Sequence, residues 1–272
     1  MDTTVNVTVA GAAGRMGTRL VSLIHDSPSL NLVGALESPD HRALGRDAGE
    51  LAGCGTTGVT LTADLESACA SSHVIVDFTT PSATLVHLRH AVSRRQPMVI
   101  GTTGFSPEES RLLQEEASRI PCVWSPNMSV GVTVLLQLLG KVAQVLGDDY
   151  DVEIVEAHHQ KKKDAPSGTA LKLAEVVASA KGWHLPEVAV YARHGFIGER
   201  AKRTIGIQTI RAGDIVGDHT VLFGGLGERI EIIHRAHNRD PFARGALRAA
   251  QWIVRQPPGL YSMAHVLGLV AT

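Results

Sequence analysis

The sequence is poor in aromatic residues and cysteine, and neither sign of charge is in excess. Aromatic residues make up 4% of its 272 positions, and the three cysteines, Cys54, Cys69 and Cys122, show neither CxxC spacing nor neighbouring histidines. This pattern indicates no metal centre and favours free thiols in a reducing compartment. The formal net charge of -1 points to neither a nucleic-acid nor a membrane-surface partner.

The sequence also offers little sign of targeting or membrane insertion. Residues 1–11 run into a strand pattern without the basic and apolar regions of a signal peptide, and we expect no apolar run to approach the length of a membrane span. These features predict a cytoplasmic protein. Hydrophobic residues make up 44% of the chain, enough for a sizeable core, and 272 residues suggest two domains.

The first part of the chain alternates short β-branched runs with helical segments. Strand patterns lie at residues 5–11, 30–36, 73–79, 97–103 and 122–127. Between the last two, residues 106–120 begin with Ser106, a candidate cap followed by acids that suit a helix N-terminus. Strands alternating with helices predict an α/β domain with a Rossmann-like, doubly wound parallel sheet.

After an apolar helix pattern at 129–146, the alternation of short strands and helices ends. Longer strand patterns follow at residues 150–159, 204–213, 219–225 and 229–237, with little helix between the last three. This order predicts a second α+β domain with an open mixed sheet. The tail from residue 240 has a helical pattern again. These changes in the pattern of strands and helices place the domain boundaries near residues 128 and 240.

A glycine-rich turn, VAGAAGRMG, closes the first strand pattern and opens a helix. Its glycines, Gly11, Gly14 and Gly17, follow GxxGxxG spacing rather than the GxGxxG fingerprint, and such a turn alone is as often a plain βα connection. Glu37, 20 residues after Gly17 at the end of the second strand pattern, is placed to accept hydrogen bonds from an adenosine ribose. Together these features favour dinucleotide binding.

Two further loops, GTTGF (101–105) and SPNMS (125–129), end neighbouring strand patterns of the same sheet. Ligands of doubly wound folds bind at that edge, and the small residues suit a backbone that passes close to a cofactor. Thr79 and Thr80 belong to the same rim. The candidate cofactor-binding residues are Gly11, Ala12, Ala13, Gly14, Arg15, Met16, Glu37, Gly101, Thr102, Thr103, Ser125, Pro126, Asn127 and Met128.

The stretch EAHHQKKKDAPSGTA (156–170) concentrates titratable and basic residues before a helix pattern that Ser167 or Thr169 could cap. A helix N-terminus beside ammonium groups can receive a carboxylate or phosphate. A histidine there can give or take a proton. The adjacent His158 and His159 could also be a structural pair or metal ligands, although neighbours on a strand point to opposite faces.

Nearly the whole chain resembles the dihydrodipicolinate reductase family. The resemblance rests on VAGAAGRMG, DAGELAG, VDFT, VIGTTGF, SVGV, EAHHQKKKDAPSGTA, RAGDIVGDHTV and GERIEIIH, in that order. It implies an N-terminal dinucleotide domain (1–127) completed by the C-terminal helix (241–272), a substrate-binding and oligomerisation domain (128–240), and a homotetramer. The implied reaction is NAD(P)H-dependent reduction of 4-hydroxy-tetrahydrodipicolinate to tetrahydrodipicolinate in the diaminopimelate route to lysine, with hydride going to ring carbon 4.

The resemblance also assigns roles to residues. It implies that His158 is the acid/base and Lys162 its partnering proton donor, and that His159, Gly168 and Thr169 contact the substrate. Arg239 matches a basic position near the active site, although a salt bridge would explain it equally well.

Cofactor choice is where the chain departs from the family. Enteric-type members carry an arginine after the ribose-binding acid and another in the DFT loop, whereas this chain has Ser38 and Thr80. Loss of those cations should weaken NADPH relative to NADH, with Arg15, His41 or Arg42 as partial compensation. We expect both cofactors to work, NADH at least as well.

Three other functions stay open at this stage. A non-catalytic dinucleotide sensor would share the glycine turn but has no need of His158 and Lys162. A two-domain reductase of an acyclic semialdehyde would share the cofactor half. A metal hydrolase would use His158 and His159 as ligands.

Overall fold

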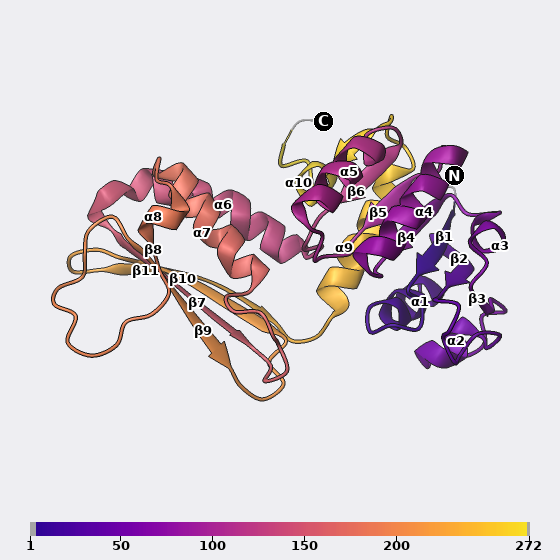
Figure 1. Cartoon of the computed structure of the whole chain (residues 1–272), viewed down its shortest axis with the longest axis horizontal. Coiled ribbons are helices and arrows are strands. Elements are labelled where there is room, and N and C mark those ends of the chain that lie inside the picture. Colours follow the sequence, from indigo (N-terminus) through magenta and orange to yellow (C-terminus); the bar gives the residue numbers. More distant parts are fainter. Residues whose placement is uncertain (1–3, 271–272) are drawn as a thin grey trace. The chain divides into compact units, whose positions relative to one another are not determined.

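The computed structural model describes residues 4–270, and the chain divides into two compact units. Unit 1 comprises Met1–Val130 and Arg239–Thr272, and unit 2 comprises Gly131–Asn238. Each unit has its own sheet and its own core (Figure 1). The C-terminal segment therefore belongs to the same unit as the N-terminal segment.

Unit 1 is built on a seven-stranded parallel sheet with the order β12-β6-β5-β4-β1-β2-β3. Its strands are β1 (Val5–Ala10), β2 (Leu30–Leu36), β3 (Leu61–Thr62), β4 (Val74–Asp77), β5 (Met98–Ile100), β6 (Pro121–Trp124) and β12 (Gly259–Tyr261). Its helices are α1 (Gly17–His25), α2 (Ala48–Ala52), α3 (Leu65–Cys69), α4 (Pro81–Arg94), α5 (Pro107–Ala117), α9 (Asp240–Ile253) and α10 (Met263–Val266). The predicted Rossmann-like parallel sheet is confirmed.

Alternation along the central strands explains why helices cover both faces of this sheet. Val74 and Val76 of β4 pack with residues of α1 and α9, whereas Ile75 between them packs with residues of α4 and α5. Because successive side chains of a strand point to opposite faces, an uninterrupted apolar run fits a sheet buried on both sides.

Unit 2 holds a five-stranded mixed sheet with the order β11-β10-β7-β9-β8. Its strands are β7 (Asp151–His158), β8 (Ala189–Val190), β9 (Ile205–Arg211), β10 (Gly217–Gly224) and β11 (Arg229–Ala236). Its helices are α6 (Val130–Leu146), a 3₁₀ turn (Gly147–Asp149), α7 (Gly168–Ala180) and α8 (Leu185–Val188). The predicted mixed sheet is also confirmed.

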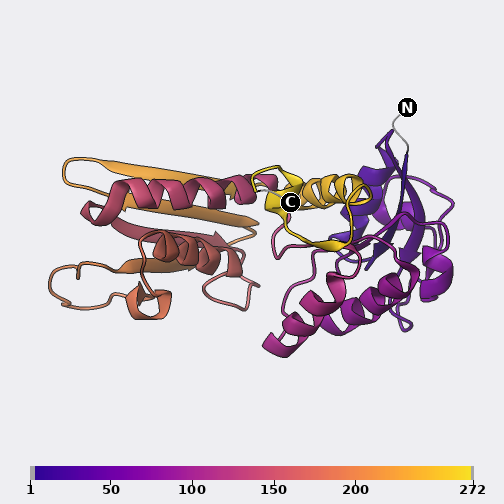
Figure 2. The same ribbon diagram turned by 90° about the horizontal axis from the view of Figure 1, so that it is seen from above.

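The core of unit 2 lies between its sheet and its two long helices. Leu139 of α6 and Leu173 of α7 pack against Val152 and Ile154 of β7 and Phe223 of β10. In Figures 1 and 2 both helices lie on the same side of the sheet. Alternate strand residues therefore face away from this core.

Helix α6 corrects one expectation. With the following 3₁₀ turn it forms a helical segment, Val130–Asp149, that is long and apolar enough to cross a membrane by length and composition alone. The expectation that no apolar run approaches that length was therefore wrong. Leu135 and Leu139 are buried against the sheet, whereas Val134 and Leu138 are exposed. Core helices can pass the same test, so length and composition are weak evidence for a membrane span.

Candidate functional site

The glycine turn of unit 1 joins β1 to α1 and packs so closely against neighbouring backbone that two of its glycines leave no room for a side chain. Gly11 has a φ of +77°, and a Cβ on it would lie 2.6 Å from the carbonyl oxygen of Phe78. A Cβ on Gly17 would lie 2.0 Å from the carbonyl oxygen of Gly11. Gly14, by contrast, is exposed. Gly11 and Gly17 thus permit the tight packing of the turn, and Gly14 presents bare backbone to solvent.

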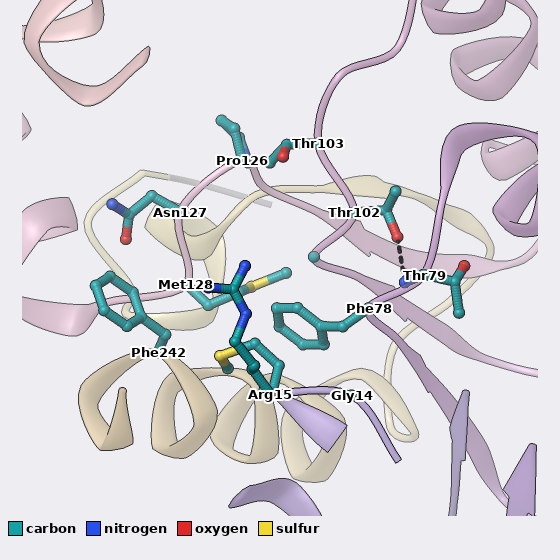
Figure 3. Close-up of a pocket in the computed structure, with 12 residues that line it drawn as sticks. Gly14, Arg15, Phe78, Thr79, Thr102, Thr103, Pro126, Asn127, Met128 and Phe242 are labelled. Atoms are coloured by element: carbon teal, nitrogen blue, oxygen red, sulfur yellow. Dashed lines mark hydrogen bonds between the residues drawn. The ribbon is translucent and has the colours of Figure 1, made fainter. Parts of the chain in front are cut away.

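A cavity of about 390 Å³ opens beside this turn (Figure 3). Nine of the predicted cofactor residues line it: Gly14, Arg15, Met16, Gly101, Thr102, Thr103, Pro126, Asn127 and Met128. Phe78, Thr79 and Phe242 complete the lining. The volume is within the range of small-molecule sites, and most of the lining follows the carboxyl ends of β1, β4, β5 and β6.

The other predicted cofactor residues lie outside that lining. Gly11 and Ala12 are buried in the base of the turn, and the hydroxyl of Ser125 donates to the carbonyl oxygen of Asn127 at 2.8 Å. Glu37 follows β2, where its carboxylate accepts hydrogen bonds from the backbone N–H of Ala13 at 3.0 Å and of Ser38 at 3.1 Å. Glu37 therefore ties the glycine turn to the end of β2.

Two arginines bring positive charge to this region of unit 1. Arg15 lines the cavity, and Arg239 precedes α9. Burial lowers the pKa of Arg239, and the charge of Arg15 lowers it further. Like charges held near each other are a feature of anion sites.

In unit 2, strand β7 ends at His158, whose imidazole is held by a buried carboxylate. Nδ1 of His158 lies 2.6 Å from Oε2 of Glu156, which is fully buried two residues earlier on the same face. Arg211 of β9 donates to both carboxylate oxygens of Glu156, at 2.9 and 2.8 Å. The backbone N–H of Ser167 and the hydroxyl of Thr209 donate to the same carboxylate.

This arrangement fixes the histidine's orientation and its surroundings. Because the Glu156 carboxylate accepts a hydrogen bond from Nδ1–H, the lone pair of neutral His158 is on Nε2. A Cβ on Gly217 would lie only 3.1 Å from Nε2, so Gly217 leaves room for the ring. His219 meets His158 edge to face, with ring centroids 5.2 Å apart.

The charges of this cluster follow from its contacts. Burial alone would raise the pKa of Glu156, but hydrogen bonds from Arg211, His158 and Ser167 lower it to about 2. Burial lowers the pKa of His158, Glu156 opposes that effect, and Lys162 and Arg211 add to it. Burial, with the charge of His158, lowers the pKa of His219 to about 4. Glu156 is therefore anionic and His219 neutral near pH 7.

The loop after β7 leads from the histidines to the start of α7. Lys162 pairs with Asp164, 2.9 Å between Nζ and Oδ2. Ser167 is the N-cap of α7, with its hydroxyl accepting from the backbone N–H of Ala170 at 3.2 Å and lying 3.2 Å from Nε2 of His219. Gly168 and Thr169 form the first turn, at the positive end of the helix dipole.

Sequence reasoning missed part of this cluster. Glu156, Arg211 and His219 were not among the predicted site residues, although Glu156 lies two positions before His158 and so shares its face of the strand. Arg211 and His219 come from other strands, and only the sheet register brings them close. Among residues 4–270 no group of three or more His, Cys, Asp or Glu side chains could hold a metal ion.

Comparison with known families gives a match over both units. Residues 5–128 match the model described as "Dihydrodipicolinate reductase, N-terminus", and residues 131–267 match "Dihydrodipicolinate reductase, C-terminus".

Individual relatives agree with these matches. A protein named 4-hydroxy-tetrahydrodipicolinate reductase from Syntrophobacter fumaroxidans is 56% identical over 97% of this chain and 99% of its own length. One of the same name from Syntrophus aciditrophicus is 55% identical over 96% and 97%. Dipicolinate-bound dihydrodipicolinate reductase from Paenisporosarcina sp. TG-14 superposes with a TM-score of 0.72 at 26% identity, over 95% of this chain and 97% of that one.

Proposed function

The chain belongs to the dihydrodipicolinate reductase family, and we propose that it reduces 4-hydroxy-tetrahydrodipicolinate to tetrahydrodipicolinate in lysine biosynthesis. One observation carries the assignment to this site: His158 is held by the buried Glu156 in the same unit as Lys162 and the start of α7. This cluster combines a proton donor with groups that attract carboxylates. Such a combination suits reduction of a ring bearing two carboxylates.

Unit 1 has the features that a dinucleotide needs. The bare backbone at Gly14 and the N-terminus of α1 suit a pyrophosphate, and the residues on the loops after β4, β5 and β6 line a cavity of suitable size. We therefore assign the cofactor to unit 1, as NADH or NADPH. When bound, the cofactor would supply the hydride that takes the place of the hydroxyl group on ring carbon 4, and that hydroxyl group leaves the ring as water.

In unit 2 we assign the acid/base role to His158. Glu156 holds Nδ1, so Nε2 is the atom that gives or takes the proton. The carboxylate of Glu156 also stabilises the imidazolium form that a proton donor requires, which offsets part of the effect of burial. Lys162, whose charge acts on His158, is the proposed partner in proton delivery.

We assign recognition of the substrate carboxylates to His159, Lys162, Gly168 and Thr169. Gly168 and Thr169 lie in the first turn of α7, where backbone N–H groups and the helix dipole favour an anion. Lys162 adds an ammonium group from the preceding loop. The hydroxylated ring and its dehydrated form present the same carboxylates, so both would meet these groups alike.

Cofactor preference depends on the residues at positions 38 and 80. Ser38 is exposed beside Glu37, and Thr80 caps α4 through its hydroxyl, so neither supplies a cation for a 2′-phosphate. We propose that both cofactors are used and that NADH is at least as good as NADPH. An NADPH preference above about tenfold in kcat/KM, about 1.4 kcal/mol, would contradict this.

We further propose a cytoplasmic homotetramer assembled through unit 2. On the sheet face away from α6 and α7, Ile210 and Ile233 are exposed, which leaves apolar surface for other subunits to cover. Light scattering should give about four times the 28.9 kDa chain mass at micromolar concentration. An Ile233→Lys variant should dissociate, and a wild-type monomer would refute the assembly.

The function is tested by following the loss of reduced-nicotinamide absorbance. The substrate is made in place by the preceding synthase from pyruvate and aspartate semialdehyde, and NADH and NADPH are supplied in turn. Substrate-dependent oxidation that His158→Gln lowers by about 10²-fold or more is the expected result. Binding of both cofactors without turnover would instead support a sensor or a reductase of another substrate.

A further inference from the structure

A second buried carboxylate, Asp77 at the end of β4 in unit 1, has a set of partners that the reaction described above does not use. Asp77 is fully buried. Its Oδ1 accepts hydrogen bonds from the backbone N–H of Thr79 at 3.1 Å and from the hydroxyls of Thr79, Thr84 and Thr102 at 2.7, 2.9 and 2.9 Å. Nδ1 of His87 lies 2.6 Å from Oδ2.

These partners come from three different segments. Thr79 is on the loop after β4, Thr102 is on the loop after β5, and Thr84 and His87 are on α4. The Thr84 hydroxyl is also 2.8 Å from that of Thr102, and the backbone N–H of Thr79 donates to the Thr102 hydroxyl at 3.0 Å, the bond drawn in Figure 3. The carboxylate thus ties both loops to each other and to the helix.

The two loops form a large part of the cavity wall. Phe78, Thr79, Gly101, Thr102 and Thr103 supply five of its twelve lining residues. A Cβ on Gly101 would lie 2.2 Å from the ring of Phe78, so the loops also fit closely against each other. Asp77, Thr84 and His87 themselves do not line the cavity.

We propose that Asp77, Thr84 and His87 are positioning residues for the nicotinamide cofactor, acting by fixing the loops 78–80 and 101–103 in the shape that binds it. This rests on the proposed function, because it takes the cavity of unit 1 as the cofactor site. Burial of a charged carboxylate costs free energy unless hydrogen bonds replace its lost hydration. The hydrogen bonds to Asp77 do this, and they join the two loops that line the cavity. A core needed only for stability could use apolar side chains at these positions.

The test compares Thr84→Val with Thr84→Ser and Gln96→Leu. Thr84→Val keeps the shape but removes the hydroxyl, whereas Thr84→Ser retains it. Gln96 is a matched control because it is buried before β5 and donates to the carbonyl oxygen of Ser72 at 2.7 Å, at the amino ends of the strands. The readouts are the NADH dissociation constant by fluorescence titration, the melting temperature and the binding of dipicolinate.

Thr84→Val should raise the NADH dissociation constant about tenfold or more, while dipicolinate binding stays within twofold. Thr84→Ser should stay close to the wild type, and Gln96→Leu should lower the melting temperature without changing NADH binding. If Thr84→Val lowers the melting temperature as Gln96→Leu does and leaves NADH binding within twofold, the proposal is overturned.

A second variant guards against misfolding of the first. His87→Leu removes the partner of Oδ2 and leaves the hydroxyl donors in place, so it should weaken NADH binding in the same direction. Unchanged NADH binding in a folded His87→Leu protein would exclude His87 from the role. Failure of the wild type to bind NADH at all would overturn the proposed function itself, which separates the two failures.

Discussion

At the scale of single residues, Glu156 controls both the orientation and the charge of His158. Its carboxylate opposes the lowering of the pKa of His158 by burial. Glu156→Gln should therefore lower that pKa further and leave Arg211 without its anionic partner. Because a proton donor must be protonated, the basic limb of the kcat/KM profile should move to lower pH.

The measurement is a pH profile of kcat/KM for the wild type and Glu156→Gln, together with NADH binding. At pH 8 the variant should lose at least about tenfold in kcat, since carboxylates that orient a catalytic histidine contribute up to ~10⁴-fold. NADH binding in unit 1 should not change. A profile of unchanged shape, lowered equally at every pH, would show that Glu156 serves the fold alone.

The proposed cofactor specificity also depends on a single residue, Ser38. Ser38→Arg places a cation after Glu37, where it can pair with a 2′-phosphate. The ratio of kcat/KM for NADPH to that for NADH should rise about tenfold. Ser38→Gln, of similar length but neutral, is the control. An equal rise with Gln would mean that charge is not the cause.

Residue-scale prediction from sequence worked where neighbours in the chain are neighbours in space. Gly11, Gly14 and Gly17 were identified because one turn contains them. Arg211 and His219 were missed because only the register of β9 and β10 with β7 brings them close to Glu156 and His158. The roles of His158 and Lys162 remain predictions that the proposed variants test.

At the scale of elements, α5 and α7 both begin with a serine cap. Ser106 caps α5 in a capping box with Glu109, and Ser167 caps α7. Substitution of either by alanine should lower the free energy of unfolding by about 1 kcal/mol. Only Ser167→Ala should raise the KM for the substrate, because only α7 begins at the proposed carboxylate site. Denaturant unfolding and steady-state kinetics check both, and an equal KM for both variants would contradict the assignment of α7.

Element prediction succeeded where the pattern was long enough to read. The four longer strands of unit 2 and the Ser106 cap are confirmed. Strands β3, β8 and β12, each of two or three residues, were not predicted. For α6, composition gave the helix correctly but not the fact that one side, including Val134 and Leu138, is exposed.

At the scale of the whole molecule, buried histidines should make stability depend on pH. The pKa of His219 is about 4 in the folded chain against an ordinary value of 6.5. Between pH 6.5 and 4 the unfolded chain therefore binds a proton at this histidine that the folded chain does not bind. The contribution of neutral His219 to the free energy of unfolding is complete above pH 6.5 and is lost as the pH falls towards 4. The difference corresponds to about 3 kcal/mol for this residue.

Melting temperatures measured between pH 7 and 4.5 check this for the wild type and His219→Gln. The wild type should melt at lower temperature as the pH falls. The variant, which cannot take up the proton at this position, should show a smaller decrease. The lowered pKa of Glu156 to about 2 acts only below pH 4.5, because above that pH the carboxyl is ionised in both states. Identical decreases in both proteins would refute the neutral, buried state of His219.

The architecture of the two units was predictable because the order of strand and helix patterns along the sequence differs between them. Alternating strands and helices indicated the parallel sheet of unit 1, and longer strands with little helix between them indicated the mixed sheet of unit 2. The packing of α9 with unit 1 was not derivable from periodicity, and only the family resemblance suggested it.

The most direct test of the account is the fate of the hydride. Wild-type protein is given NADH deuterated at both C4 hydrogens, with substrate generated in place, and the product is analysed by NMR. The expected result is one deuterium per product molecule, at ring carbon 4. Oxidation of NADH that leaves ring carbon 4 without deuterium, or no substrate-dependent oxidation, would contradict it.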